Sequence, residues 1–244
     1  MNKFTFDSQS RLYRYASGKR TGQIVSEKAM AKLLENYMIQ QRSNISTATD
    51  DVINNRISVK DWQSSLASSL KSMHINSYSL GRGGVKQIDA DDMKSIKNRL
   101  KSEFNYLEKF AREIEGGSLS EAQIKNRVRL YVDAAYSQWQ LGREIAAFDS
   151  GENFEIWDSA EDSCTDCSGK SQLGWQPIGA LGTPGVGVRC LSQCRCNKRF
   201  GSDRNGGEVG LAVGRRDGWI LGRSAVTIAN FRRKPSRHIP DESS

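Results

Sequence analysis

The sequence lacks any long apolar run. None of its 244 residues belongs to an uninterrupted stretch of about 20 apolar side chains, the length that a membrane-spanning helix requires. Residues 1–22 carry polar and charged side chains where a secretory signal peptide has a continuous apolar segment. We therefore expect synthesis in the cytoplasm and no membrane partner.

Histidine is almost absent, which disfavours cysteine-based catalysis. A cysteine nucleophile needs a neighbouring base, most often a histidine. The two histidines are His74, within a predicted helix, and His238, in a polar segment. Neither has a sequence reason to meet a cysteine. The segment Gly81-Arg82-Gly83-Gly84 lacks the preceding strand and the lysine of a phosphate-binding loop, so it is expected to end a helix. We expect no enzymatic activity.

Proline is missing from the first 176 residues, and helical periodicity dominates there. Between residues 26 and 148, apolar side chains recur every three or four residues, which predicts several long amphipathic helices. Ser26, Ser58, the acidic segment 89–92, and either Ser118 or Ser120 are expected to begin them. Residues 89–115 and 119–147 predict a helical hairpin of matched length. The apolar stripe of its first helix is Met93, Ile96, Leu100, Phe104, Leu107, Ala111 and Ile114.

All four prolines and many glycines follow Gly151, which predicts a small loop-rich module. Short strands are expected at 154–157, 186–188 and 219–221. The predicted fold class is α+β and mainly α: a long helical hairpin and flanking helices, then the small cysteine-containing module. The predicted divisions are an N-terminal arm or hairpin (1–25), a helical domain (26–150), a cysteine-rich module (151–200) and a basic C-terminal tail (201–244).

Five cysteines occur, all between residues 164 and 196. An odd number in a reducing compartment argues against a disulfide framework. Two clusters separated by a short loop are typical of a structural zinc site, in which four thiolates complete a tetrahedron. Two ligands are expected from the first cluster and two from the second. The candidate zinc ligands are Cys164, Cys167, Cys190, Cys194 and Cys196.

Two other uses of the cysteines fit the sequence less well. A redox Cys-x-x-Cys pair begins a helix in a βαβ unit, whereas Ser168-Gly169 and a predicted loop follow Cys167. An open catalytic zinc site has histidine or carboxylate ligands and a water position. The nearby carboxylates are more simply solvated loop residues; they are Asp158, Glu161, Asp162 and Asp166.

The net charge of +8 is unevenly distributed along the chain. Residues 186–237 contain 12 Lys and Arg against three acidic residues, a net of +9. This asymmetry indicates either a polyanionic partner or an ordinary solvated basic tail. The candidate nucleic-acid-binding residues are Arg215, Arg216, Arg223, Arg232, Arg233, Lys234 and Arg237.

Several short motifs occur in a fixed order between residues 45 and 200. They are Met73-His74-Ile75-Asn76-Ser77-Tyr78, Leu80-Gly81-Arg82-Gly83-Gly84, Phe104-Asn105-Tyr106-Leu107, and Cys164-x2-Cys167 followed by Cys190-x3-Cys194-Arg195-Cys196. In this ordered set the chain resembles the minor head, or head morphogenesis, proteins of tailed phages, relatives of the F protein of phage Mu. Members often end this region with Asn-Cys-Arg-Cys after a histidine. Here Gln193 replaces the asparagine and Cys190 stands close to the missing histidine, as a substitute ligand.

The resemblance implies a virion structural protein, made in the host cytoplasm and located in the head interior or at the portal vertex. Its implied partners in a multi-subunit assembly are the portal protein and/or the major capsid protein, together with packaged double-stranded DNA. The alternative is a zinc-ribbon-type nucleic-acid-binding regulator, which the basic C-terminal half favours and the long helical hairpin disfavours.

Overall fold

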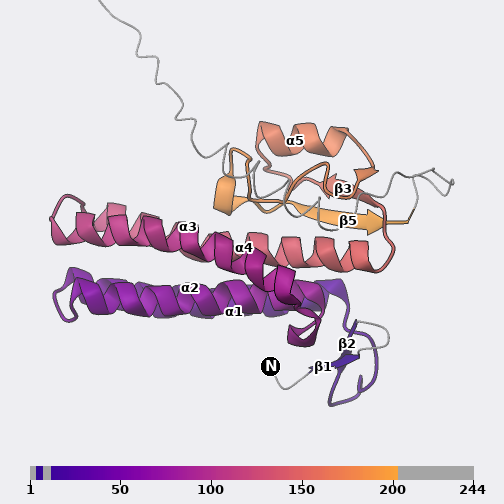
Figure 1. Ribbon diagram of the computed structural model, residues 1–244, viewed down its shortest axis with the longest axis horizontal. Coiled ribbons are helices and arrows are strands. Elements are labelled where there is room, and N and C mark those ends of the chain that lie inside the picture. Colours follow the sequence, from indigo (N-terminus) through magenta and orange to yellow (C-terminus); the bar gives the residue numbers. More distant parts are fainter. Residues whose placement is uncertain (1–3, 8–11, 203–244) are drawn as a thin grey trace, which may run out of the picture. The chain divides into compact units, whose positions relative to one another are not determined.

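The computed structural model describes residues 4–7 and 12–202, and most of them lie in four long helices (Figure 1). A short 3-10 turn joins the second helix to the third, and a small antiparallel sheet with one short helix follows the fourth. The predicted α+β, mainly α class is confirmed. None of the helices among these residues is long and apolar enough to cross a membrane. The bounds are α1 Glu27–Ile53, α2 Val59–Arg82, η1 Val85–Gln87, α3 Ala90–Glu115 and α4 Glu121–Asp149.

The long helices begin at the capping residues that the sequence predicted. The side chains of Ser26 and Ser58 each accept a hydrogen bond from a backbone N–H three residues ahead. Asp89 and Asp92 form a reciprocal capping box at the start of α3. Of the two serines proposed for α4, Ser120 is the cap. Each cap stabilises its helix by about 1 kcal/mol because it pairs backbone donors that have no partner inside the helix.

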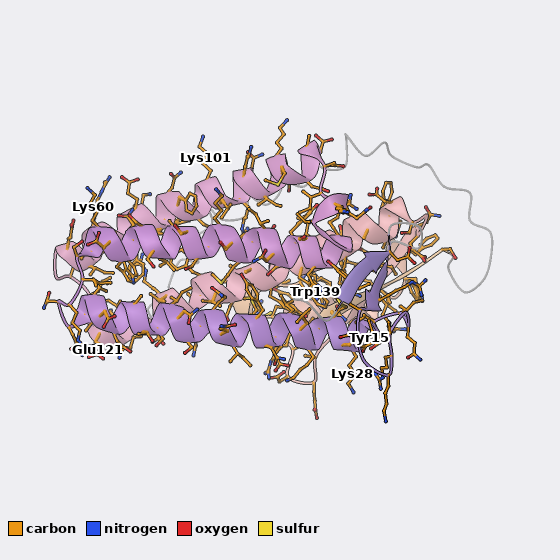
Figure 2. All side chains as sticks on the ribbon, turned by 90° about the horizontal axis from the view of Figure 1, so that it is seen from below. Tyr15, Lys28, Lys60, Lys101, Glu121 and Trp139 are labelled. Carbon is orange, nitrogen blue, oxygen red and sulfur yellow. The ribbon has the colours of Figure 1, made fainter. Side chains whose placement is uncertain are left out.

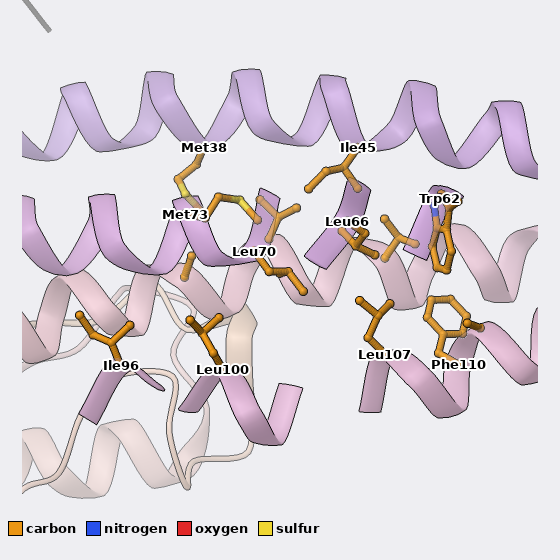
Figure 3. Close-up of a cluster of buried hydrophobic side chains, with 14 of the residues drawn as sticks. Met38, Ile45, Trp62, Leu66, Leu70, Met73, Ile96, Leu100, Leu107 and Phe110 are labelled. Atoms are coloured by element: carbon orange, nitrogen blue, oxygen red, sulfur yellow. The ribbon is translucent and has the colours of Figure 1, made fainter. Parts of the chain in front are cut away.

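Helix α2 packs against α1, α3 and α4. Its buried side chains Trp62, Leu70 and Met73 face apolar side chains of α1 and α3 (Figure 3). Of the seven residues in the predicted α3 stripe, four are buried and three half-buried. Phe110 lies outside that stripe yet is fully buried, because its ring packs edge-on against Trp62 with centroids 5.5 Å apart.

Two glycines let the backbones of α2 and α4 touch. A Cβ atom at Gly81 would lie 2.2 Å from the carbonyl oxygen of Trp139, and one at Gly142 would lie 2.4 Å from that of Tyr78. Both obstacles are backbone atoms, so no side chain can rotate away to make room. The sequence placed Gly142 on the inner face of its helix, but gave no sign that it lies opposite Gly81.

We expect Gly142→Ala to lower the free energy of unfolding by about 1–3 kcal/mol, because the added methyl group forces the two helices apart. This loss outweighs the gain of about 1 kcal/mol that alanine normally brings to a helix interior. Urea unfolding followed by circular dichroism measures the difference. The control is Gly169→Ala, also in a helix and with no atom within 4 Å of the added Cβ, which should be neutral or stabilising. Equal stability of Gly142→Ala and the wild type would contradict the close crossing.

The N-terminal residues form paired strands. Strands β1 (Phe4–Asp7) and β2 (Leu12–Tyr15) are antiparallel, with Phe4 opposite Tyr15. After a turn that follows Tyr15, the chain runs back beside β2, and Arg14 forms an antiparallel β-bridge with Ile24. These strands lie within residues 1–25, the segment predicted as an N-terminal arm or hairpin.

The C-terminal module is a three-stranded antiparallel sheet in the order β4-β3-β5. The expected strand at 154–157 is present as β3, but the one expected at 186–188 is wrong. There the chain turns, with Gly185 and Gly187 at positive φ, a region that a strand does not use. The expected strand at 219–221 lies outside the described residues. The module's elements are β3 Phe154–Asp158, α5 Thr165–Gln172, β4 Gln176–Pro177, η2 Leu191–Gln193 and β5 Asn197–Gly201.

Candidate metal centre

The five cysteines lie at the ends of three short elements that converge. Cys164 is the N-cap of α5 and Cys167 lies in its first turn. Cys190 and Cys194 flank the 3-10 turn η2, and Cys196 immediately precedes β5. The few residues between the cysteines of each cluster thus form a turn, and this turn places the thiols of that cluster on one side of the chain.

Three sulfur–sulfur distances link four of these cysteines. The Sγ atom of Cys190 lies 3.5 Å from that of Cys164 and 3.6 Å from that of Cys167. The Sγ atoms of Cys167 and Cys194 lie 3.8 Å apart. All five are free thiols. Four sulfurs bound to one zinc at about 2.3 Å stand about 3.8 Å apart at the corners of a tetrahedron. The three distances therefore match three of the six edges of such a site.

The sulfur atoms form two triads, each with all members within 4.8 Å of one another. The outer triad is Cys164, Cys167 and Cys190, and the inner triad is Cys167, Cys194 and Cys196. Cys167 belongs to both. The inner triad is fully buried, whereas Cys164 and Cys190 are half-buried. All the cysteines that the sequence proposed are thus brought together and can hold a metal ion.

Hydrogen bonds favour a charged sulfur at the edge of this cluster. Burial raises the pKa of the Cys164 thiol, but backbone N–H groups of Cys167 and Cys190 outweigh that effect and lower the pKa to about 7. The backbone N–H of Ala160 donates to the Cys196 sulfur over 3.4 Å. Burial raises the pKa of Cys167, and it raises that of Cys190 to about 12 with help from the thiol of Cys164. A bound cation would reverse this rise, because it stabilises each thiolate directly.

The cysteines also make up much of the module's small core. Cys167, Cys194 and Cys196 are buried in one cluster with the apolar side chains of Trp157, Leu181 and Val188. Such a core is small for an independent fold. A metal ion bonded to the same thiols would supply the stability that apolar burial does not.

The expectation of a loop after Cys167 is wrong, because α5 begins at Thr165. The carbonyl oxygen of Cys164 accepts a hydrogen bond from Ser168 N–H, which starts the helix despite the glycine that follows. The redox alternative gains a helix from this result, but not its βαβ setting, since β3 is antiparallel to both neighbouring strands. In addition, Cys164 and Cys167 both contact Cys190, as members of a larger thiol cluster do.

Three of the four nearby carboxylates have arginine partners. Asp158 pairs with Arg199, Asp162 with Arg195 and Asp166 with Arg189. Asp166 also accepts a hydrogen bond from the backbone N–H of Arg189, 23 residues later, and so joins α5 to the second cysteine cluster. These carboxylates form ion pairs at the surface of the module. This agrees with their interpretation as solvated residues rather than zinc ligands.

The one histidine in the described part of the chain lies in the helical core. His74, on α2, is fully buried, and its Nε2 lies 2.9 Å from a carboxylate oxygen of Glu103 on α3. The side chain beside its Nε2 is therefore a glutamate rather than a cysteine, which weighs against a cysteine–histidine catalytic pair.

A buried ion cluster, which the sequence analysis missed, holds the module against α4. The ammonium group of Lys198 on β5 contacts the carboxylates of Glu144 on α4 and Glu155 on β3, and all three side chains are fully buried. It also donates to the carbonyl oxygen of Gly182 over 2.8 Å. Burial lowers the pKa of Lys198 to about 8, against the opposing effect of Glu155. The sequence carries no clear signal of this cluster, because Lys198 lies among polar residues directly after the last cysteine.

Polar contacts beside this cluster extend the same interface. Asn197 accepts hydrogen bonds from Gln140 and Arg143 of α4, over 2.9 Å and 2.6 Å. The guanidinium of Arg143 also lies over the rings of Trp139 and Phe200. The segment that follows the last cysteine therefore fixes the module to the long helix.

The seven basic residues proposed to bind nucleic acid, all between 215 and 237, lie outside the described residues. The chain matches no protein-family model, no curated protein and no solved structure in the comparisons made.

Proposed function

We propose that the protein is a non-enzymatic structural component of a tailed-phage head, and that one zinc ion holds its cysteine module. The observation that carries the proposal is the thiol cluster, in which four sulfurs are linked at distances close to the edges of a zinc tetrahedron. A closed cluster of thiols suits a structural ion rather than a catalytic one.

Zinc is favoured over other ions by the kind of ligand. Thiolates select zinc, copper(I) or iron–sulfur clusters, whereas calcium and magnesium require oxygen ligands. Three of the four nearby carboxylates are paired with arginines, so sulfur is the main donor at the cluster. A d10 zinc ion accepts four thiolates without redox chemistry.

The head role is supported by the resemblance of the ordered motifs to minor head proteins and by the way the module is attached. A metal-held module fixed to long helices by buried ions and cation–aromatic contacts is suited to a fixed position in an assembly. In this proposal the helices contact the portal protein or the major capsid protein.

The test of the head role is co-sedimentation. The full chain is co-expressed with the portal and major capsid proteins encoded by the same genome, and assembled particles are separated on a density gradient. We expect the chain in the particle fractions, and we expect it to shift to the top of the gradient when either partner is omitted. A chain that stays at the top although particles form would overturn the head role. Sequence-selective binding of a DNA site would then favour the zinc-ribbon-type regulator.

The basic tail should bind DNA through phosphates alone. We expect binding of the full chain to random duplex DNA to weaken by about 1,000-fold or more between about 50 and 200 mM salt, because several phosphate contacts release counterions. Changing Arg215, Arg216, Arg232 and Arg233 to Ser should weaken binding and flatten the salt dependence, as measured by fluorescence anisotropy.

The matched control changes four exposed lysines of α3, Lys94, Lys97, Lys101 and Lys109, to Ser. Figure 2 shows Lys101 extending from that helix. Both variants lose four positive charges, but only the tail variant should lose DNA. An equal loss for the two would show that net charge alone attracts DNA to the chain.

A further inference from the structure

A closed zinc site needs four ligands, and this module brings five thiols within reach of one another. The outer and inner triads share Cys167, so neither triad is separate from the other. The fifth thiol is not a distant, unrelated residue: Cys196 lies within 4.8 Å of Cys167 and Cys194. The fifth thiol therefore belongs to the same cluster as the other four.

Two sets of four ligands can be traced through these contacts, each made of one triad and the thiol of the other triad that contacts Cys167. Three residues are common to both: Cys190 and Cys194 each contact Cys167, at 3.6 and 3.8 Å. Cys164 completes the first set through its 3.5 Å contact with Cys190. Cys196 completes the second through the inner triad. The two sets thus differ by a single exchange.

We propose that one soft divalent cation is held by either of two overlapping ligand sets, with Cys196 able to take the place of Cys164. This proposal rests on the zinc-held module proposed above and deepens it, since it assigns roles within the site: Cys167, Cys190 and Cys194 as permanent ligands, and Cys164 and Cys196 as alternates.

The two alternates differ in exposure in the way that such an exchange requires. Cys164 is half-buried at the start of α5, where water and other ligands reach its sulfur. Cys196 is 1% exposed, and its sulfur accepts a hydrogen bond from Ala160 N–H, which orients it within the inner triad. When the outer ligand is displaced, the inner one keeps the ion four-coordinate.

The exchange balances in charge. Cys196 loses its thiol proton as its sulfur bonds to the cation, and the departing Cys164 sulfur takes up one proton. Either set contains four thiolates and one thiol, so the net charge of the site does not change. If the exchange changed the net charge of this buried site, the free-energy cost of burying that charge would oppose it.

The test compares zinc affinities of full-length variants by competition with a chromophoric chelator. Cys164→Ala and Cys196→Ala should each bind one zinc with an affinity within about tenfold of the wild type, the smaller end of the effects seen for indirect ligand partners. The double variant, with three thiols left, should lose more than about 100-fold. Cys167→Ala, which removes the shared ligand, should lose as much by itself. Non-additivity between the first two changes is the signature of substitution.

Cobalt(II) gives a second readout that does not depend on affinity. Visible spectra of the Cys164→Ala and Cys196→Ala proteins should both show tetrahedral four-thiolate coordination, whereas the double variant should not. Far-UV circular dichroism checks that the helices are retained in each protein.

Three outcomes separate the possibilities. Loss of zinc in Cys164→Ala as large as in the double variant would overturn the exchange but leave the zinc-held module standing. Two ions per wild-type chain in native mass spectrometry would also overturn it, because the two triads would then be separate sites. A wild-type chain that binds no soft cation would overturn the zinc-held module itself.

Discussion

If zinc holds the cysteine module as proposed, removing it should unfold residues 154–201 while leaving the four long helices folded. Structural zinc contributes on the order of 10 kcal/mol in small thiolate sites, and the apolar core of this module is too small to replace it. Segment-resolved amide hydrogen exchange, before and after treatment with a strong chelator, measures the effect. We expect protection in β3 and β5 to be lost and protection in α2 to remain.

The control for this experiment is zinc return, which should restore protection in β3 and β5. Elemental analysis of the starting protein should give about one zinc per chain, as a single four-thiolate site requires. Unchanged protection in the chelated, metal-free protein would contradict a metal-held module, and the cysteines would then be an ordinary buried thiol cluster.

Replacing Lys198 with Met should cost about 3–5 kcal/mol of unfolding free energy, since it leaves the carboxylates of Glu144 and Glu155 buried without a counter-charge. The loss should shrink as the pH falls toward 5. In the variant, protonation of the two buried carboxylates removes the negative charge that Lys198 no longer balances, so the folded state gains stability as the pH falls. Urea unfolding at several pH values measures both effects.

The matched control removes the whole ion cluster. Glu144→Leu and Glu155→Gln are added to Lys198→Met, and the glutamine keeps the oxygen that accepts the Leu181 N–H over 2.8 Å. This triple variant should recover most of the lost stability, because a buried ion cluster is replaceable by uncharged groups of similar size. A triple variant as unstable as the single one would mean that Lys198 acts through its other contact, the carbonyl of Gly182.

The helices were predictable because their signals are local. Ser58 accepting from Asp61 N–H, or the stripe that includes Ile96 and Leu100, depends on residues a few positions apart. The cysteine cluster was also predictable, since two Cys pairs with a short gap carry the pattern of a metal site. Those features need no knowledge of which helices meet.

What escaped prediction depends on contacts between distant residues. From the sequence alone, Lys198 would be expected at the surface, because its buried partner Glu144 lies 54 residues earlier. The sequence predicts that Gly81 lies at a helix end and Gly142 in a helix interior. Only the structure shows that the two backbones cross there. Strand β5 was not predicted, because its second residue, Lys198, is charged yet lies buried beside two carboxylates instead of being exposed to water. The choice of four ligands among five cysteines likewise needs sulfur positions that spacing does not give.

Cys196 and Lys198 are two residues apart, and in the proposed zinc-held module this short separation makes metal affinity and attachment to α4 reciprocal. Cys196 belongs to the thiol cluster, and Lys198 enters the carboxylate pair that joins the module to the long helix. Positions that bind the ion and positions that hold the helix are therefore fixed by one piece of backbone. By thermodynamic linkage, if the helix contact raises the zinc affinity by some factor, zinc binding strengthens the helix contact by the same factor. A partner that bends or pulls α4 thus also changes how tightly the metal is held.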